Sequence, residues 1–462
     1  MEFKEREFIP VLLGGDINTY SVARAFYEQY QVKSYVFGKY QTGPSFRSKI
    51  TIYEGNQAID TDDYFMKRIN RFANEHKDKK ILLIGCGDSY VALASRHKNE
   101  FPANVIAPYI DFDLMDSLQQ KERFYELCEK HGVAYPKTIV YKREMGLDFA
   151  CDYPYPVILK PSNSIAYWEH PFETQKKIYK IKDRAELERV IEEIYGAGYD
   201  DDLIIQDMIP GNDEYMRVLT SYSDRDGKVK MMCLGHVLLE EHTPHGLGNH
   251  AVIITEPNKE LMGRVKNLLE DLHYVGFSNF DIKYDQRDNT YRFFEINTRQ
   301  GRSNYYVTGS GFNVAKYFVE DYIYHNELPY EEATEEHLWM TVPKGVAYKH
   351  VKNPEYVAKM KKLVSEGKMV NPVFKKGDLG LNRFLRMVKT HLPISSRQIA
   401  SASCTMRIFS GVTSPMMRIA SPGPGKGWRL TNSSGKPSSR PAWRVSSLNR
   451  FRRGSMISLK ST

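Results

Sequence analysis

The chain has 462 residues, 41% of them hydrophobic, and this length and composition are typical of a protein with two or three globular domains. No apolar run approaches the roughly 18 residues that span a bilayer, so we expect no integral membrane segment. Five cysteines are scattered without a CxxC pair or metal-site spacing. This usage favours the reducing cytoplasm and argues against a disulfide scaffold or a zinc site.

The net charge of +8 is unevenly distributed along the chain. Residues 379–462 hold 15 of the 65 Lys and Arg residues and no Asp or Glu. Residues 1–378 therefore hold 50 basic and all 57 acidic residues, a net charge of −7. A nucleic-acid-binding domain would carry its positive charge on the folded body, so we expect no nucleic-acid partner for it.

The segment 392–462 is rich in Ser, Arg, Gly and Pro and has neither a helix nor a strand period. It offers too little apolar surface to offset its ordering entropy, and we expect a disordered tail. Two interpretations stay open. One is a basic arm that meets an anionic membrane surface or nucleic acid. The other is a segment without function, whose abrupt composition reflects translation out of frame.

Residues 8–37 are predicted as strand, turn, helix and strand, and the pattern returns at KKILLIGCGD followed by SYVALASRHK. Alternating elements of this length indicate a parallel sheet covered by helices, here a doubly wound α/β domain over 1–112. Gly-rich turns at 14–16 and 85–88 follow two strands, at the edge where open α/β sheets bind ligands. Neither turn completes GxGxxG, so tight turns alone also explain them.

Two lysines follow in contexts that suit phosphate binding. The stretch SLQQKERFYELCEKHGVAYPKT predicts an amphipathic helix that carries Lys121 and ends near Gly132. The strand VILK then delivers Lys160 just before the small polar loop SNS, as a loop that closes over phosphates requires. The alternative for Lys160 is an ordinary surface lysine.

The remainder of the body is predicted as an α+β layer over 113–330. Strands are expected in DDLIIQDMIPGND, EYMRVLTSYS, KVKMMCLGHVLLEE and HAVIIT, followed by the amphipathic helix NKELMGRVKNLLEDLHYVG. SNFDIKYD and TYRFFEIN are expected to form a hairpin. A helical extension over 331–391 comes after this layer.

The hairpin places Asp281 on its first strand and Glu295 on its second, with Asn297 and Arg299 at alternate positions beyond. Residues two apart in a strand share a face, so three oxygen donors can converge beside a guanidinium. Oxygen ligands without His or Cys suit Mg²⁺, held by one or two carboxylates together with substrate phosphates. Taken alone, the pattern also fits polar residues at a strand end.

The order of these pieces, from Lys121 and Lys160 through IIQDMIPG to FDIKYD and FFEINTR, resembles the ATP-grasp superfamily over residues 8–330. The resemblance implies an ATP-grasp fold, with the doubly wound domain followed by a two-lobed nucleotide-binding region over 113–330. It implies ATP and Mg²⁺ as cofactors, with both lysines at the nucleotide phosphates. The implied adenine and hinge residues are Gln206, Asp207, Met208 and Ile209. The implied metal ligands are Asp281, Glu295 and Asn297, with Arg299 on the transferred phosphoryl group.

Within the superfamily, PVLLGGDINTYSVARAFYEQY and EINTRQGRSNYYVTGSGFN look like the D-aspartate ligases that build the side-chain bridge of peptidoglycan. The resemblance implies that the β-carboxylate of D-aspartate is activated as an acyl phosphate. It is then joined to the lysine ε-amine of a UDP-linked muramyl pentapeptide, with release of ADP and phosphate. The alternatives are a ligase for another amino acid and amine, and a nucleotide-binding protein without turnover.

Further candidates lie around the hairpin. Arg299 and Arg302 are the expected donors to the oxyanion of the tetrahedral intermediate and to the acidic substrate. Ser303, Asn304 and Ser310 are candidates for the acceptor pocket, with a structural role as the alternative.

Three histidines, His242, His245 and His250, lie in a predicted loop between two strands. Their spacing matches no standard metal site. A lid over the site and a solvated hairpin turn are the two interpretations that remain. No residue identifies itself from the sequence as the base for the amine.

Overall fold

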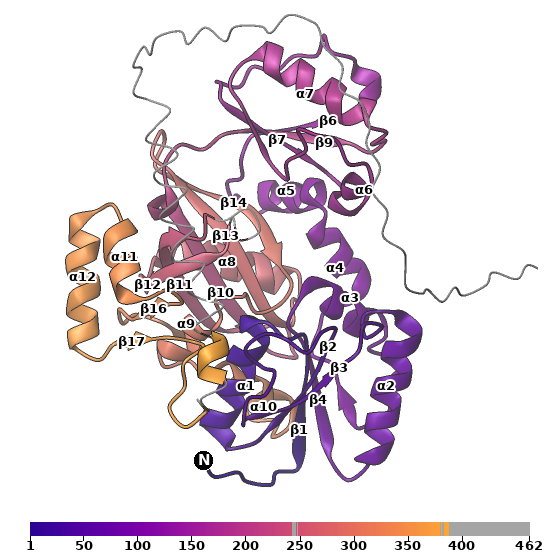
Figure 1. The fold of residues 1–462 in the computed structure, drawn as a ribbon, viewed down its shortest axis with the longest axis vertical. Coiled ribbons are helices and arrows are strands. Elements are labelled where there is room, and N and C mark those ends of the chain that lie inside the picture. The colour runs from indigo at the N-terminus through magenta and orange to yellow at the C-terminus, as the bar shows by residue number, and fades with distance from the viewer. Residues whose placement is uncertain (243–245, 247, 379, 381–382, 388–462) are drawn as a thin grey trace, which may run out of the picture. The chain divides into compact units, whose positions relative to one another are not determined.

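A computed structural model describes residues 1–242, 246, 248–378, 380 and 383–387, and the predicted tail over 392–462 lies outside them. The described chain forms a five-stranded, a four-stranded and an eight-stranded sheet (Figure 1). Within these ranges, every helix is too short or too polar to span a bilayer.

The first sheet is parallel, in the order β3-β2-β1-β4-β5. Its strands are β1 (Phe8–Leu13), β2 (Ser34–Gly38), β3 (Thr51–Gly55), β4 (Lys80–Gly85) and β5 (Val105–Ile106). Helices α1 (Ile17–Tyr30), α2 (Asp62–Glu75) and α3 (Asp88–Arg96) connect them.

Successive residues of β1 pack into different layers, because side chains alternate along a strand. Val11 and Leu13 belong to the core that also contains residues of α2 and α3, whereas Leu12 belongs to the core of α1. Helix α1 begins at Asp16, whose carboxylate accepts from the Thr19 backbone N–H at 3.1 Å. The sequence predicted this βαβ arrangement.

The helix predicted over 117–131 is instead two helices, α4 (Phe112–Gln119) and α5 (Lys121–Lys130). They meet at Gln120, whose extended backbone (ψ 116°) ends one helix and begins the next. Lys121 is therefore the first residue of α5 rather than a mid-helix residue.

The four-stranded antiparallel sheet has the order β6-β9-β7-β8 and makes up most of a small lobe (Figure 1). Its strands are β6 (Thr138–Tyr141), β7 (Val157–Pro161), β8 (Tyr179–Ile181) and β9 (Leu203–Asp207). Helix α7 (Arg184–Gly196) packs Leu187, Ile191 and Ile194 against it. The chain after β7 forms helix α6 (Ser164–Glu169), where the sequence suggested only a polar loop.

The large sheet runs β14-β13-β10-β11-β12-β16-β17, and β15 pairs with β11. Its strands are β10 (Met216–Ser223), β11 (Val229–Glu240), β12 (His250–Thr255), β13 (Gly276–Asp285), β14 (Thr290–Asn297), β15 (Glu331–Glu332), β16 (Leu338–Met340) and β17 (Met369–Val370). The helices of this region are α8 (Lys259–Asp271), α9 (Tyr305–Gly309), α10 (Val314–Tyr322), α11 (Lys344–His350) and α12 (Pro354–Ser365). One-turn 3₁₀ helices cover Arg143–Met145 and Asp213–Tyr215.

The extension predicted as helical over 331–391 also supplies strands. Besides α11 and α12, it contributes β16 and β17 to the large sheet (Figure 1), and β15, which pairs with β11. The tripeptide Leu338–Met340 pairs with β12 and is buried. Leu338 and Met340 pack with Met360 and Leu363 of α12, whereas Trp339 belongs to the core that contains α1. A three-residue strand is too short to show a period, so the sequence did not reveal it.

The chain beyond β17 returns to the N-terminal sheet through Asp378. Its buried carboxylate accepts hydrogen bonds from Tyr20 Oη at 2.6 Å, Ser48 Oγ at 2.8 Å and the Lys49 backbone N–H at 2.6 Å. The guanidinium of Arg383, also buried, lies 3.5 Å away. A single carboxylate therefore holds together segments from both ends of the described chain.

Replacing Asp378 with alanine is expected to lower the free energy of unfolding by about 3–5 kcal/mol, because it leaves the Arg383 guanidinium buried without its carboxylate. Urea denaturation followed by circular dichroism measures the change. Glu260→Ala, which removes an exposed carboxylate on α8, is the control and should shift the value by less than about 1 kcal/mol. Equal values for the two variants would contradict this role.

Candidate active site

A cavity of about 920 Å³ lies between the small lobe and the β13–β14 hairpin. This volume is large enough for a nucleotide and part of a second substrate. The eleven residues predicted for catalysis, nucleotide binding and metal binding all line this cavity: Lys121, Lys160, Gln206, Asp207, Met208, Ile209, Asp281, Glu295, Asn297, Arg299 and Arg302.

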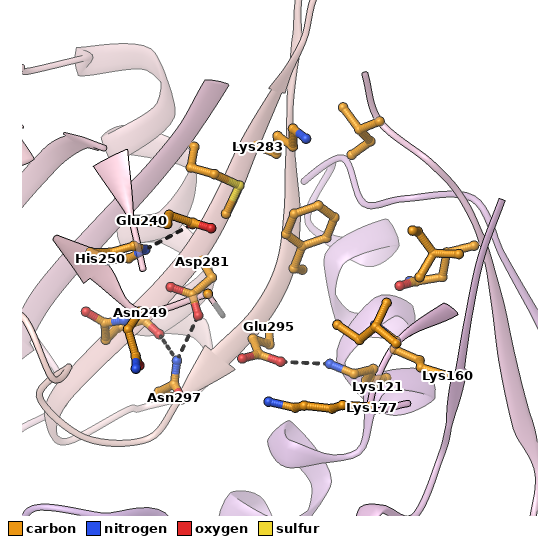
Figure 2. A pocket seen from close by; sticks show the side chains of 18 of the residues that line it. Lys121, Lys160, Lys177, Glu240, Asn249, His250, Asp281, Lys283, Glu295 and Asn297 are labelled. Atoms are coloured by element: carbon orange, nitrogen blue, oxygen red, sulfur yellow. Dashed lines mark hydrogen bonds and ion pairs between the residues drawn. The ribbon is translucent and has the colours of Figure 1, made fainter. Parts of the chain in front are cut away.

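The β13–β14 hairpin sets the two carboxylates face to face. Asp281 and Glu295 are register partners on adjacent antiparallel strands, and both side chains point into the cavity (Figure 2). The next pair is Ile282 with Phe293, so Phe294 is an extra residue that forms a β-bulge. The bulge lets Phe294 and Glu295, although consecutive, both line the cavity.

The carboxylates differ in their electrostatic surroundings. Glu295 Oε2 lies 2.8 Å from Lys121 Nζ, and the lysine charge lowers the pKa of Glu295. Enclosure by the cavity wall, followed by the negative charge of Glu295, raises the pKa of Asp281 well above its ordinary value. Two carboxylates that face each other across a hairpin form a site that a divalent cation would stabilise.

Lys160, at the end of β7, faces these carboxylates together with Lys121 and Lys177 (Figure 2). Burial, followed by the charge of Lys121, lowers the pKa of Lys160 to about 7. Lys180 from β8 lines the same wall. This concentration of ammonium groups favours a polyanion in the cavity, because a bound anion raises the pKa of Lys160 and restores its full charge.

The strand β9 leads into the hinge predicted for the adenine. Gln206 Nε2 donates to Tyr125 Oη and Thr138 Oγ1, both at 2.9 Å. The Asp207 carboxylate accepts from Arg287 at 3.0 and 2.7 Å. Because the side chains of Gln206 and Asp207 already bind protein groups, Met208 and Ile209 are the residues of this segment that remain for a ligand.

The two arginines after β14 are held by different partners. Arg299 Nε and Nη2 donate to the Asp88 carboxylate at 2.7 and 3.0 Å, so the first residue of α3 presents a carboxylate at the cavity. Arg299 Nη2 also lies 3.3 Å from Asn297 Oδ1. Arg302 Nη2 donates to Glu241 Oε1 at 3.0 Å.

These features can be compared with known proteins. The chain is 40% identical over 398 residues to a D-aspartate ligase of Enterococcus faecium (strain Aus0004), which covers 83% of this chain and 94% of that protein. The chain belongs to the D-aspartate ligase family. It is an ATP-dependent carboxylate–amine ligase, as the sequence predicted. No family model matches the chain.

Solved structures confirm the predicted ATP-grasp fold of this D-aspartate ligase family member. The N5-carboxyaminoimidazole synthetase of Staphylococcus aureus superposes with a TM-score of 0.52 at 14% identity, over 75% of this chain and 85% of that one. The biotin carboxylase domain of the Hydrogenobacter thermophilus 2-oxoglutarate carboxylase gives 0.52 at 17% identity, over 72% and 73%. The latter structure contains ADP and its magnesium salt.

ATP and Mg²⁺, the cofactors expected of the ligase, fit the residues that are present. Among the described residues, no three His, Cys, Asp or Glu side chains form a complete metal site. Two carboxylates with an amide nearby are, however, what Mg²⁺ needs when nucleotide phosphates supply the remaining oxygens. Asn297 lies beside this pair, with its Nδ2 at 3.4 Å from Asp281 Oδ2.

The remaining predicted residues of the ligase divide between cavity and core. Ser303 lines the cavity, whereas Asn304 is buried and donates to Asn18 Oδ1 at 2.8 Å. Ser310 is buried and lies 2.7 Å from Thr255 Oγ1 through its own Oγ. The contacts of Asn304 and Ser310 therefore fit a structural role, which was the alternative to a place in the acceptor pocket.

The histidines do not act as one group. His250 is the first residue of β12, lines the cavity and is buried, which lowers the pKa of its imidazole to about 4. His242 Nε2 lies 2.7 Å from Asp213 Oδ2. His245 lies outside the described residues, so the lid interpretation stays untested.

Several lining residues were missed by the sequence reasoning. Lys283 is two positions beyond Asp281 on β13, and strand alternation alone could have found it. Glu240, whose pKa burial and the charge of Asp213 raise to about 7, belongs to no motif. Lys177 and Asn249 lie in connecting segments, where no periodicity marks the direction of a side chain.

Proposed function

We propose that this ligase joins the β-carboxylate of D-aspartate to the lysine ε-amine of a UDP-linked muramyl pentapeptide. The observation that carries the proposal is the 40% identity to a D-aspartate ligase, over 94% of the length of that protein. The convergence of all eleven predicted residues on one cavity supports a working site. The cytoplasm is the proposed place of action, because ATP and nucleotide-linked precursors are available there.

The first proposed step makes the carboxylate reactive. A β-carboxylate oxygen attacks the γ-phosphorus of ATP, ADP leaves, and an acyl phosphate forms. Lys121 and Lys160 would hold the phosphates, and the Gln206–Ile209 strand end would receive the adenine. Mg²⁺ held by Asp281, Glu295 and Asn297 would neutralise phosphate charge. Positioning and charge neutralisation supply most of the catalysis in phosphoryl transfer.

The second proposed step forms the amide. The neutral ε-amine attacks the acyl carbon, and the negative charge collects on the former carbonyl oxygen. The nitrogen then releases a proton to solvent, and phosphate leaves. Arg299, which donates to Asp88 and Asn297, would donate to that carbonyl oxygen and to the transferred phosphoryl group. Arg302 is the second proposed donor to the acidic substrate.

The domain roles follow from the same site. We assign 1–112 as the substrate-side domain, which contributes Asp88 to the cavity, and 113–330 as the ATP-grasp domain. The strands of the extension over 331–391 complete the large sheet of that domain.

Release of ADP with Mg²⁺, measured across a panel of D- and L-amino acids with and without the pentapeptide, tests the proposal. We expect release that requires D-aspartate and the pentapeptide together and stops when EDTA removes the metal. Mass spectrometry should show a product that equals the two substrates minus one water. If ADP is released with another amino acid and not with D-aspartate, the assignment as a ligase stands. D-aspartate is then rejected as its substrate.

A further inference from the structure

Arg302 lines the cavity, and the two proposed steps do not specify which group of the substrate it binds. Its side chain is 34% exposed, and its Nη2 is fixed at 3.0 Å by the buried carboxylate of Glu241. Its Nη1 is buried and has no acceptor among the described residues, so the guanidinium has a donor that a ligand in the cavity could satisfy. A planar pair of N–H groups matches a carboxylate.

The two arginines serve different ends of the cavity. Arg299 contacts Asn297, and its charge acts on Asp281, which places it at the phosphoryl end. Arg302 contacts Glu241, and its charge acts on His250. Arg299 therefore lies beside the proposed reacting centre, whereas Arg302 lies beside Glu241, the first residue after β11.

The surroundings of Arg302 suit the head group of an amino acid. Burial, followed by the charge of Arg302, lowers the pKa of His250 to about 4, so the imidazole is neutral at physiological pH. Glu240 Oε1 lies 4.0 Å from His250 Nε2 and also lines the cavity (Figure 2). A cation for a carboxylate and an acidic group for an ammonium thus share one wall, as a zwitterionic head group requires.

We infer that Arg302, held in place by Glu241, binds the α-carboxylate of the amino acid, so that the side-chain carboxylate reaches Arg299 and the nucleotide. This inference rests on the proposed function and extends it, because it explains which of two carboxylates is activated. Glu241 acts through Arg302 and is a positioning residue. A substrate with only one carboxylate could not occupy both arginines.

The test compares D-aspartate with D-isoasparagine, its α-amide, which keeps the β-carboxylate and loses the α-carboxylate. The quantity measured is the ratio of the two kcat/KM values for ADP release with the pentapeptide present. We expect Arg302→Gln to reduce this preference for D-aspartate by roughly 10- to 100-fold, the range for a hydrogen bond between charged groups. Arg302→Lys, which keeps the charge, should recover part of the preference.

Matched variants separate recognition from general damage. Arg299→Lys should lower kcat/KM for both substrates and leave the ratio of the two values unchanged. Arg299 acts on the β-carboxylate, which both substrates have. Glu241→Gln keeps the size of the side chain and should lower the ratio in the same direction as Arg302→Gln. Arg264→Gln, on the exposed face of α8, should alter neither rate nor ratio.

The outcomes distinguish this inference from the proposed function. If the wild type forms no product with D-aspartate, the proposed function falls. If the wild type forms product and Arg302→Gln keeps the wild-type ratio, only the α-carboxylate site is rejected. Should Arg302→Gln fail to fold, an unchanged ratio in Glu241→Gln rejects the site, and a lowered ratio supports it.

Discussion

Replacing Glu295 with glutamine is expected to reduce ADP release by at least about 100-fold while the protein stays folded. The substitution keeps the shape of the side chain but removes the charge that faces Asp281 and binds Lys121 at 2.8 Å. Mg²⁺ would lose a carboxylate ligand, and Lys121 would lose the partner that offsets its burial. Steady-state rates measured over a range of Mg²⁺ concentrations should show that excess metal does not restore the activity.

The control for this variant is Glu260→Gln, an exposed carboxylate at the start of α8. Its activity should match that of the wild type. A Glu295→Gln enzyme with a rate within about twofold of the wild type would remove Glu295 from the proposed metal site.

Replacing Lys160 with methionine is expected to weaken ATP binding by roughly 10- to 100-fold and, at neutral pH, to stabilise the protein without nucleotide. The folded-state pKa of about 7 lies below the roughly 10.4 of an unfolded lysine. Between these values the unfolded chain holds more protons, so this group makes wild-type stability rise with pH from about 7 to about 10. The free-energy cost of burying the charged Lys160, which methionine removes, is therefore greatest at or below pH 7.

Thermal unfolding at pH 6.5 and pH 9.5 measures the stability effect, and calorimetry measures ATP affinity. We expect the variant to melt above the wild type at the lower pH, with the difference shrinking at the higher pH. ATP affinity of the wild type should fall above pH 7, because phosphate binding returns a proton to Lys160. Lys182→Met, an exposed lysine, should change neither property. A less stable Lys160→Met protein with unchanged ATP affinity would contradict both expectations.

Much of this site was visible in the sequence because its residues sit on regular strands. Asp281, Glu295 and Asn297 alternate along a hairpin, and alternation fixes the face on which a strand residue lies. Lys160 ends an apolar strand, and its position follows from the same rule. These side chains could be placed without knowing how the two lobes meet.

The other features depend on contacts between distant segments. The bulge at Phe294 leaves no mark in the sequence, although it turns a hydrophobic residue toward the cavity. The break at Gln120 interrupts an amphipathic pattern that reads as one helix. From the sequence Glu241 has the features of a surface acid, yet it is buried, and its ion-pair partner Arg302 comes from beyond β14. Periodicity predicts which face of a helix or strand a residue lies on. It does not predict which residues of a distant segment contact that face.

The Asp378 junction has a consequence for how the protein is made. Ser48 and Asp378 are 330 residues apart, yet their hydrogen bond joins the N-terminal sheet to the chain beyond β17. A ribosome that adds about 5–20 residues per second needs roughly 15–65 s to cover this distance. During that interval the nascent N-terminal sheet is exposed without its last partner. Until Asp378 is made, the hydroxyls of Tyr20 and Ser48 lack the buried carboxylate that accepts their hydrogen bonds in the folded chain.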